Sequence, residues 1–178
     1  MRGDRSLSDL ALEVRMFDHE MRDAAERVLH ACRKRGLKLV TAESCTGGLV
    51  AATLTAISGS SDVVERAYVT YANEAKREML GVPWDALLGY GAVSDPVARA
   101  MAAGALARSG VDLAVSVTGV AGPGGGTPEK PVGLVHFGGA RAGHEIIAER
   151  HVFPGDRDAI RRVAVITALT ILASLAER

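Results

Sequence analysis

Short strand-like runs alternate with helical repeats along most of the chain, and this alternation restricts its fold more than any other feature. Runs typical of strands occupy residues 37–42, 67–71, 113–118, 133–140 and 145–153. Apolar residues at helical spacing, with glycine stops and polar caps, predict helices over 17–34, 47–58, 73–80, 95–109 and from Asp156 to the C-terminus. The pattern therefore predicts an α/β domain with a mixed, largely parallel sheet.

The length of the chain fits one domain of ordinary size. It has 178 residues, of which 48% are apolar but only 4% aromatic, so small aliphatic side chains must fill the core. The polar and charged residues 1–15 are predicted to form an N-terminal extension, and residues 16–178 a single domain.

Charge and cysteine content narrow the possible partners. Twenty-one basic residues balance 21 acidic ones, which argues against nucleic acid or an acidic membrane held by bulk electrostatics. No apolar run approaches the roughly 18 residues of a membrane span, and no secretory signal is seen. Cys32 and Cys45 form no metal-binding or disulfide motif, and the five histidines are scattered, so we expect a cytoplasmic protein without a metal.

The segment from Glu43 to Gly48 (ESCTGG) follows a predicted strand and opens a predicted helix. A serine on such a turn, Ser44, can act as a nucleophile, and backbone N–H groups around Thr46 and Gly47 can face an oxyanion. The alternative is that a hydroxyl here only caps the helix. Cys45 is a second possible nucleophile, although a buried structural thiol is the simpler interpretation.

The segment from Tyr71 to Lys76 (YANEAK) is the second candidate. With Asn73 as the N-cap, Lys76 falls in the first helical turn, where the helix dipole and burial would lower its pKa. A neutral lysine can serve as a general base for serine, and Tyr71 could relay or donate a proton. The alternative is a solvated lysine beside acidic neighbours.

A glycine-rich loop over residues 118–131 is the third candidate. It lacks the phosphate-loop and dinucleotide motifs, yet Thr118, Gly119 and Gly122 could present backbone groups to an anion or a carboxamide. Lys130 lies between two prolines, which holds it more stiffly than an ordinary loop lysine. A flexible surface connection is the alternative.

Arg157 is the fourth candidate, because it lies in the first turn of the last predicted helix. The helix N-terminus and a guanidinium together suit a phosphate group. An ion pair with Asp156 or Asp158 is the alternative.

Several segments in the same order and spacing resemble the C-terminal domain of the CinA proteins, whose stand-alone form is the PncC-type nicotinamide-nucleotide amidohydrolase. The resemblance covers about residues 20–176 and is carried by TAESCTGG (41–48), SGSSDVVERAYVTYANEAK (58–76), GAVSDPVA (91–98), VTGVAGPGGGTPEKPVG (117–133) and FPGDRDAIR (153–161). It implies a three-layer α/β/α sandwich. The family pattern has a serine where this chain has Ala72, so one hydroxyl is missing here.

The resemblance also implies hydrolysis of nicotinamide mononucleotide (NMN) to nicotinate mononucleotide and ammonia. Ser44 would be the nucleophile, with Lys76 and Tyr71 as its catalytic partners and no cofactor. The residues that we expect to contact the substrate are Thr46, Gly47, Gly48, Asn73, Thr118, Gly119, Gly122, Lys130 and Arg157.

Three other functions stay open at this point. The chain could be a regulatory module that binds a pyridine nucleotide without turnover, an amidase for a different amide, or a structural partner domain. For the favoured function we expect a small-molecule substrate, a homo-oligomer, and neither nucleic acid nor membrane as a partner.

Overall fold

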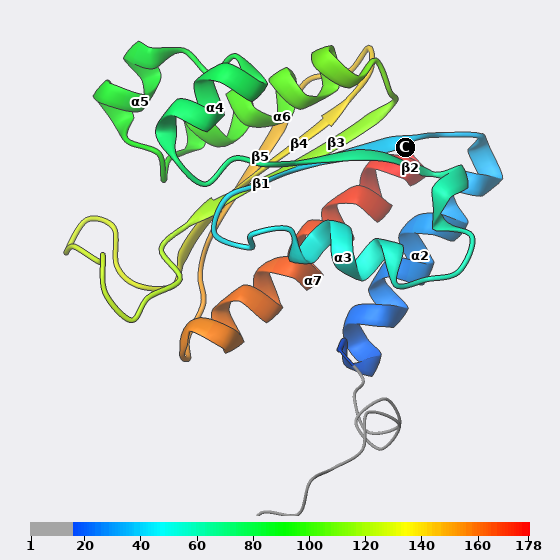
Figure 1. The fold of residues 1–178 in the computed structure, drawn as a ribbon, viewed down its shortest axis with the longest axis horizontal. Helices are drawn as coiled ribbons and strands as arrows, with labels where there is room; N and C mark the ends of the chain where they lie inside the picture. The colour runs from blue at the N-terminus through cyan, green and yellow to red at the C-terminus, as the bar shows by residue number, and fades with distance from the viewer. Residues whose placement is uncertain (1–15) are drawn as a thin grey trace, which may run out of the picture.

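A five-stranded sheet forms the middle of the fold, and helices cover both of its faces (Figure 1). The computed structural model describes residues 16–178, so the predicted extension over residues 1–15 lies outside the described part. The elements along the chain are α2 (His19–Arg35), β1 (Leu39–Glu43), α3 (Leu49–Thr55), the 3-10 helix η1 (Ser60–Asp62), β2 (Val64–Val69), α4 (Asn73–Leu80), α5 (Trp84–Tyr90), α6 (Asp95–Ser109), β3 (Leu113–Gly119), β4 (Leu134–Arg141), β5 (Ile147–Val152) and α7 (Arg157–Glu177).

The strands follow the order β2-β1-β3-β4-β5, which confirms the predicted mixed sheet. β1 pairs in parallel with both β2 and β3, whereas β3, β4 and β5 pair antiparallel. The chain passes from β1 to β2 through α3 on one face of the sheet, and from β2 to β3 through α4, α5 and α6 on the other face. The carboxyl end of β1 is therefore a topological switch point, where open α/β sheets bind ligands.

Two apolar cores, one on each face of the sheet, confirm the three-layer arrangement. The larger core joins α2, α3 and α7 to one face and includes Val28, Val117 and Leu169. The smaller core lies under α4, α5 and α6 and includes Met101 and Val40. Neighbouring residues of β1 and β3 point to opposite cores, which explains why both strands read as continuous apolar runs.

Two element starts and one missing helix are the main differences from the sequence prediction. β2 begins at Val64, three residues before the predicted start, because its exposed edge position allows the charged residues that hid it. α3 begins only at Leu49, since Gly47 and Gly48 have φ angles of +58° and +97° and belong to a turn. The short helix α5 was not predicted, because seven residues are too few for a clear repeat.

Two predicted helix caps are each wrong by one residue. Ala72, and not Asn73, is the N-cap of α4, with extended backbone angles and no side-chain hydrogen bond. Ser94, and not Asp95, precedes α6. The caps of α2 and α7 follow the usual rule, since the carboxylates of Asp18 and Asp156 accept N–H groups of the first turn.

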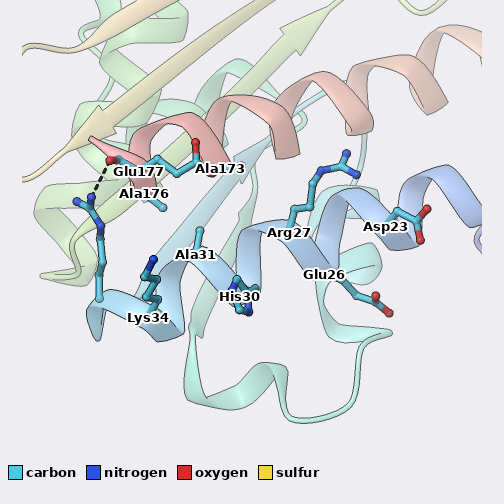
Figure 2. A pocket seen from close by; sticks show the side chains of 10 residues that line it. Asp23, Glu26, Arg27, His30, Ala31, Lys34, Ala173, Ala176 and Glu177 are labelled. Atoms are coloured by element: carbon cyan, nitrogen blue, oxygen red, sulfur yellow. Dashed lines mark hydrogen bonds between the residues drawn. The ribbon is translucent and has the colours of Figure 1, made fainter.

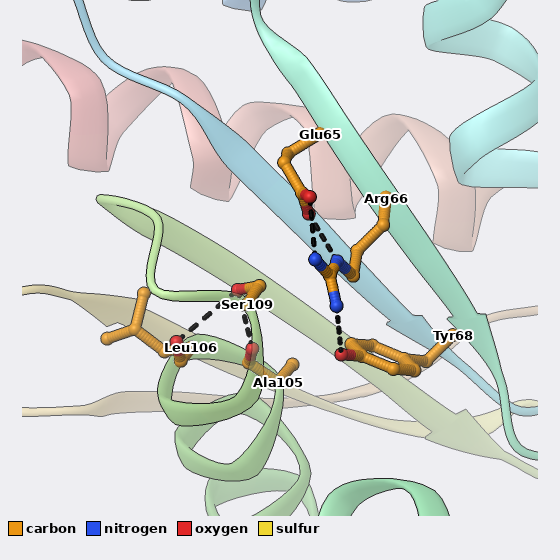
Figure 3. A network of polar contacts seen from close by, with 6 residues as sticks. All are labelled: Glu65, Arg66, Tyr68, Ala105, Leu106 and Ser109. Carbon is orange, nitrogen blue, oxygen red and sulfur yellow. Dashed lines mark hydrogen bonds and ion pairs between the residues drawn. The ribbon is translucent and has the colours of Figure 1, made fainter.

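The outer strand β2 carries polar side chains along its free edge. Arg66 contacts both carboxylate oxygens of Glu65 and lies 3.4 Å from the hydroxyl of Tyr68 (Figure 3). Across from them, the Ser109 hydroxyl donates to the Ala105 carbonyl within α6, so this hydrogen bond stays inside the last turn of the helix and does not involve β2. Charged side chains on an edge strand discourage pairing with another chain.

Helix α7 is long and apolar enough, by length and composition, to cross a membrane. Its sequence is no continuous apolar run, because arginines near its start and threonines and a serine further along interrupt it. Half of its most apolar stretch is buried, and the helix packs against α2 and the sheet, as the core helix of an α/β domain does (Figure 1).

Candidate active site

Three neighbouring strands end at one edge of the sheet and bring the first candidate residues together. The N–H of Ser44 donates to the carbonyl of Val117 on β3 at 2.9 Å, and the N–H of Thr70 donates to the carbonyl of Glu43 at 2.7 Å. These bonds hold the segments after β1 and β2 in register with β3. The residues that follow each strand, among them Ser44 and Tyr71, therefore line one cleft.

Lys76 reaches this edge from α4, and its ammonium group is enclosed. The residue is 1% exposed, and Nζ lies 3.0 Å from Ser44 Oγ, 2.8 Å from the carbonyl oxygen of Thr70 and 3.2 Å from that of Tyr71. Carbonyl oxygens only accept hydrogen bonds, so they take both N–H groups of a neutral amine. The lone pair of that amine then faces the Ser44 hydroxyl.

Burial lowers the pKa of Lys76 to about 8. The cause is desolvation of the ammonium, which outweighs a small opposite influence of Cys45. The sequence prediction of a lowered pKa is confirmed, although Lys76 follows the N-cap Ala72 by four residues and not Asn73 by three. Roughly a tenth of Lys76 is consequently neutral at pH 7, against well under a thousandth for a lysine with the reference pKa, and this neutral fraction can accept a proton.

Cys45 borders the cleft but is poorly suited to be the nucleophile. Its thiol is free and buried, and burial raises its pKa to about 11. A thiol attacks as the thiolate, which is scarce at neutral pH for this pKa. The structure therefore favours Ser44 over Cys45.

The side chain of Glu43 holds the turn that carries Ser44, a role that the sequence did not predict. Its carboxylate is fully buried and accepts the N–H groups of Gly48, Val50 and Ala51 at 2.9–3.0 Å. The Thr41 hydroxyl donates to the same carboxylate at 3.2 Å. An acidic residue in the otherwise apolar run LVTAE was the available signal.

One of the predicted oxyanion donors, the N–H of Gly47, is occupied by a hydrogen bond within the turn. The Gly47 N–H already donates to the Ser44 carbonyl at 3.0 Å, and the Gly48 N–H to Glu43. Thr46 is fully buried, and its hydroxyl has no partner within residues 16–178. The N–H groups of Cys45 and Thr46 donate to no other described residue, and Cys45, directly after the serine, also lines the cleft, so its N–H is the candidate donor.

Tyr71 and Arg157 form the open end of the cleft. The Tyr71 side chain is 62% exposed, and its hydroxyl lies 3.4 Å from Arg157 Nη2. Within residues 16–178 this hydroxyl makes no hydrogen bond to Ser44 or Lys76, so the predicted relay is not among the described contacts and stays a prediction. Arg157 Nη1 donates to the Gly122 carbonyl at 2.8 Å, which ties α7 to the glycine-rich loop.

The cleft has a volume of about 230 Å³ and gathers half of the predicted site residues. It is lined by Ser44, Cys45, Tyr71, Lys76, Ala92, Val93, Thr118, Gly119, Ala121 and Arg157. The predicted contacts that do not line it are Thr46, Gly47, Gly48, Asn73, Gly122 and Lys130. Gly47 and Gly48 shape the nucleophile turn instead, and Gly122 contributes its carbonyl to Arg157.

Lys130 and Thr118 each donate a side-chain hydrogen bond to a main-chain carbonyl. The Lys130 ammonium donates to the carbonyl of Tyr90, so it fastens the loop to the end of α5. The Thr118 hydroxyl donates to the carbonyl of Ala92 at 2.9 Å, which fixes one wall of the cleft. The apolar wall residues Ala92, Val93 and Ala121 lie inside two of the family-like segments, but the sequence did not single them out as site residues.

A larger cavity, of about 610 Å³, lies between α2 and α7 and is a different feature (Figure 2). Its walls carry charges of both signs, including Asp23, Arg27 and Lys34, and Arg35 donates to the Glu177 carbonyl beside it. No residue singled out in the sequence lines it. The smaller cleft is the candidate active site because it alone joins a possible nucleophile to a possible base.

Comparison with known proteins shows the family of this chain. The family model described as the CinA C-terminal domain matches residues 21–176. The chain belongs to the CinA C-terminal domain family. The nicotinamide-nucleotide amidohydrolase PncC of Escherichia coli (strain K12) is 52% identical over 157 residues, which are 88% of this chain and 95% of that protein.

Longer relatives and solved structures share the same domain. A CinA-like protein of Akkermansia muciniphila is 55% identical over 136 residues, which are 76% of this chain but 33% of that relative. The crystal structure of competence/damage inducible protein CihA from Agrobacterium tumefaciens superposes with a TM-score of 0.89 at 47% identity, covering 91% of this chain and 99% of that one. The CinA C-terminal fold is therefore shared over nearly all described residues.

Proposed function

We propose that this CinA-family chain is an amidohydrolase that converts NMN and water to nicotinate mononucleotide and ammonia, with Ser44 as nucleophile and Lys76 as base. The contact of Lys76 Nζ with Ser44 Oγ inside a closed pocket carries the proposed chemistry. The PncC relative, which matches over 95% of its length and is named for this activity, supports the enzyme class and the substrate.

In the first step the Ser44 hydroxyl donates its proton to neutral Lys76 while Oγ attacks the carboxamide carbon. The carbonyl oxygen becomes an oxyanion, and the Cys45 N–H is placed to receive it. Lys76, now an ammonium, keeps two N–H bonds to the carbonyls of Thr70 and Tyr71 and points the third at the reacting centre.

The tetrahedral intermediate then collapses as the C–N bond breaks. Lys76 returns its proton to the leaving nitrogen, so ammonia departs and Ser44 carries a nicotinoyl ester. A water molecule attacks the ester carbon and gives its proton to Lys76. Cleavage of the ester bond returns that proton to Ser44 Oγ and releases the carboxylic acid, so one base serves both halves of the reaction.

The open end of the cleft suits the charged part of the substrate. Arg157 stands at the N-terminus of α7, where a guanidinium and the helix end attract the same phosphate. Tyr71 lies beside it and can cover the sugar or the pyridine ring. Lys130 and Asn73 do not line the cleft and are not part of this proposal.

Ammonia release from NMN by the purified full-length chain tests the function. We expect turnover by the unaltered protein and none by Ser44→Ala, which still binds NMN in calorimetry. Cys45→Ala is the matched control, since it changes the adjacent side chain and keeps the proposed nucleophile. NMN binding without ammonia release by the unaltered protein would support the regulatory module instead.

Activity of Ser44→Ala together with an inactive Cys45→Ala would overturn the serine mechanism. Hydrolysis of other pyridine carboxamides in preference to NMN would overturn the substrate assignment and leave the chemistry in place. Including nicotinamide and nicotinamide riboside in the same assay separates these two results.

A further inference from the structure

Arg161, on α7, contacts the main chain of the nucleophile turn. Its Nε donates to the Cys45 carbonyl at 3.1 Å, and its Nη2 donates to the Thr46 carbonyl at 3.2 Å. Arg161 does not line the cleft that holds Ser44; it borders a separate cavity between α2, α3 and α7. Within residues 16–178 no carboxylate forms an ion pair with it, so the guanidinium charge acts on these two carbonyls.

The contact of Arg161 is linked to the main chain of Ser44 through shared peptide groups. In a trans peptide the C=O and the N–H point in opposite directions. The carbonyl of Thr46, held by Arg161, shares its peptide with the N–H of Gly47, and that N–H donates to the Ser44 carbonyl at 3.0 Å. The Ser44 carbonyl in turn shares its peptide with the N–H of Cys45.

We infer that Arg161 is a positioning residue that aligns and polarises the Cys45 N–H, the donor to the oxyanion, through this chain of two peptide groups. The inference rests on the proposed function, because it assigns a role within the same reaction. The charge of the guanidinium draws electron density along the chain and makes each successive N–H a better donor. Such chains strengthen each bond by roughly 10–30%.

The effect belongs to the transition state. Negative charge on the substrate oxygen develops only when Ser44 attacks, so a donor aligned for that charge raises kcat and leaves ground-state binding nearly unchanged. Arg161 also lies outside the cleft, so it offers no contact to bound NMN.

Arg162 provides a matched control on the next position of α7. Its guanidinium pairs with the carboxylates of Asp18 and Glu20 near the start of α2 and has no hydrogen bond to the nucleophile turn. Arg161 and Arg162 therefore carry the same charge on the same helix, but only Arg161 contacts peptide carbonyls beside Ser44.

The experiment compares Arg161→Met, Arg161→Lys and Arg162→Met with the unaltered protein. For Arg161→Met we expect kcat for NMN to fall about ten- to hundredfold, somewhat less than the loss on removing a direct oxyanion donor. NMN affinity, measured in a Ser44→Ala background, should change less than about twofold, which is under 0.5 kcal/mol. Arg161→Lys, which keeps the charge and can hold one carbonyl, should lie between, and Arg162→Met should keep kcat.

Amide hydrogen exchange on the free protein gives a readout that needs no substrate. Loss of Arg161 releases the Thr46 peptide, so the Gly47 N–H should exchange about tenfold faster, equivalent to ~1.4 kcal/mol of opening free energy. The same amide should be unaffected in Arg162→Met. If Arg161→Met does not fold, Arg161→Lys must show both changes in smaller measure.

Equal kcat losses in the Arg161 and Arg162 variants, or unchanged Gly47 exchange, would overturn the inference. Weaker NMN binding at constant kcat would show that Arg161 binds substrate and would also overturn it. If the unaltered protein released no ammonia from NMN, the proposed function would fail, and Gly47 exchange would still decide whether Arg161 orients the turn.

Discussion

Two cations line the candidate cleft, and their surroundings give them different abilities. Lys76 stands at the closed end, where it is 1% exposed and contacts one hydroxyl and two carbonyls. Arg157 stands at the open end, half-buried, with a carbonyl and a phenol as neighbours. Burial makes Lys76 able to lose its proton, whereas a guanidinium keeps its charge and can attract a phosphate.

This contrast separates chemistry from binding within one cleft. The closed end is built from segments of β1, β2 and α4 that are locked by main-chain hydrogen bonds, which suits proton transfer over 3 Å. The open end joins α7 to a long loop, so it can adapt to a ligand. Changes at the closed end should therefore reduce turnover, and changes at the open end should reduce affinity.

Replacement of the base Lys76 at the closed end should have the largest effect on turnover. Lys76→Arg keeps the positive charge but supplies no lone pair, since a guanidinium does not release its proton. We expect kcat to fall about a hundred- to ten-thousandfold, the usual contribution of a general base. Steady-state ammonia release measures it, and Lys76→Met, which should fold and be equally inactive, is the comparison. Substantial activity in Lys76→Arg would make Lys76 an electrostatic anchor only.

Removal of the outer cation should affect binding in a ligand-dependent way. Arg157→Met should weaken NMN about ten- to hundredfold, because a charge-assisted contact contributes roughly 1.5–3 kcal/mol. Nicotinamide riboside, which lacks the phosphate, should bind almost as before. Calorimetry in a Ser44→Ala background measures both affinities. An equal loss for the two ligands would assign Arg157 to holding the loop through Gly122.

A methyl group added at Gly104, where α6 packs against α4, should displace the helix that carries Lys76. A Cβ at Gly104 would lie 1.8 Å from the carbonyl oxygen of Leu80, near the end of the helix that carries Lys76. Overpacking of this kind costs about 1–3 kcal/mol, so Gly104→Ala should lower both stability and kcat. Gly89→Ala is the control, because a Cβ there meets nothing within 4 Å. Urea unfolding and ammonia release measure the pair; equal stability of both variants would contradict the close helix contact.

Restoring the serine of the family pattern should stabilise α4 slightly. Ala72 is the N-cap of this helix and offers no side-chain acceptor, so Ala72→Ser should add about 1 kcal/mol to the free energy of unfolding. Ala75→Ser, which places the same hydroxyl inside the helix, should not stabilise. Thermal unfolding compares the two. Greater stability of Ala75→Ser would show that α4 begins elsewhere.

Sequence reasoning predicted the fold well because each signal was local. The pattern of β1 and β3, the cap Asp156 and the glycine stops were all readable without a structure. The predicted start of the outer strand β2 lay three residues too far along the chain, because exposure weakens the periodic signal. Helix α5 was not predicted, because it is too short for a clear repeat.

The candidate site was predictable only where the chemistry sits on a recognisable motif. Ser44 and Lys76 could be predicted because strand–turn–helix segments place them. Glu43 and Arg161 could not, because their roles depend on contacts across 5 to 116 residues of sequence, and a buried carboxylate or a partly buried guanidinium has no local signature. The donor role expected at Gly47 failed for the same reason, since its N–H already donates to the Ser44 carbonyl, whereas the role expected at the Thr46 N–H stays a prediction.

The central claim is that Lys76 acts as a neutral base, and the pH dependence of kcat/KM for NMN tests it most directly. Only the neutral amine accepts the Ser44 proton, and burial lowers the pKa of Lys76 to about 8. Activity should therefore rise with pH, about tenfold per unit well below pH 8, and level off above it. A rate that is flat between about pH 6 and 10, or that rises only near the reference lysine value of about 10.4, would contradict the account.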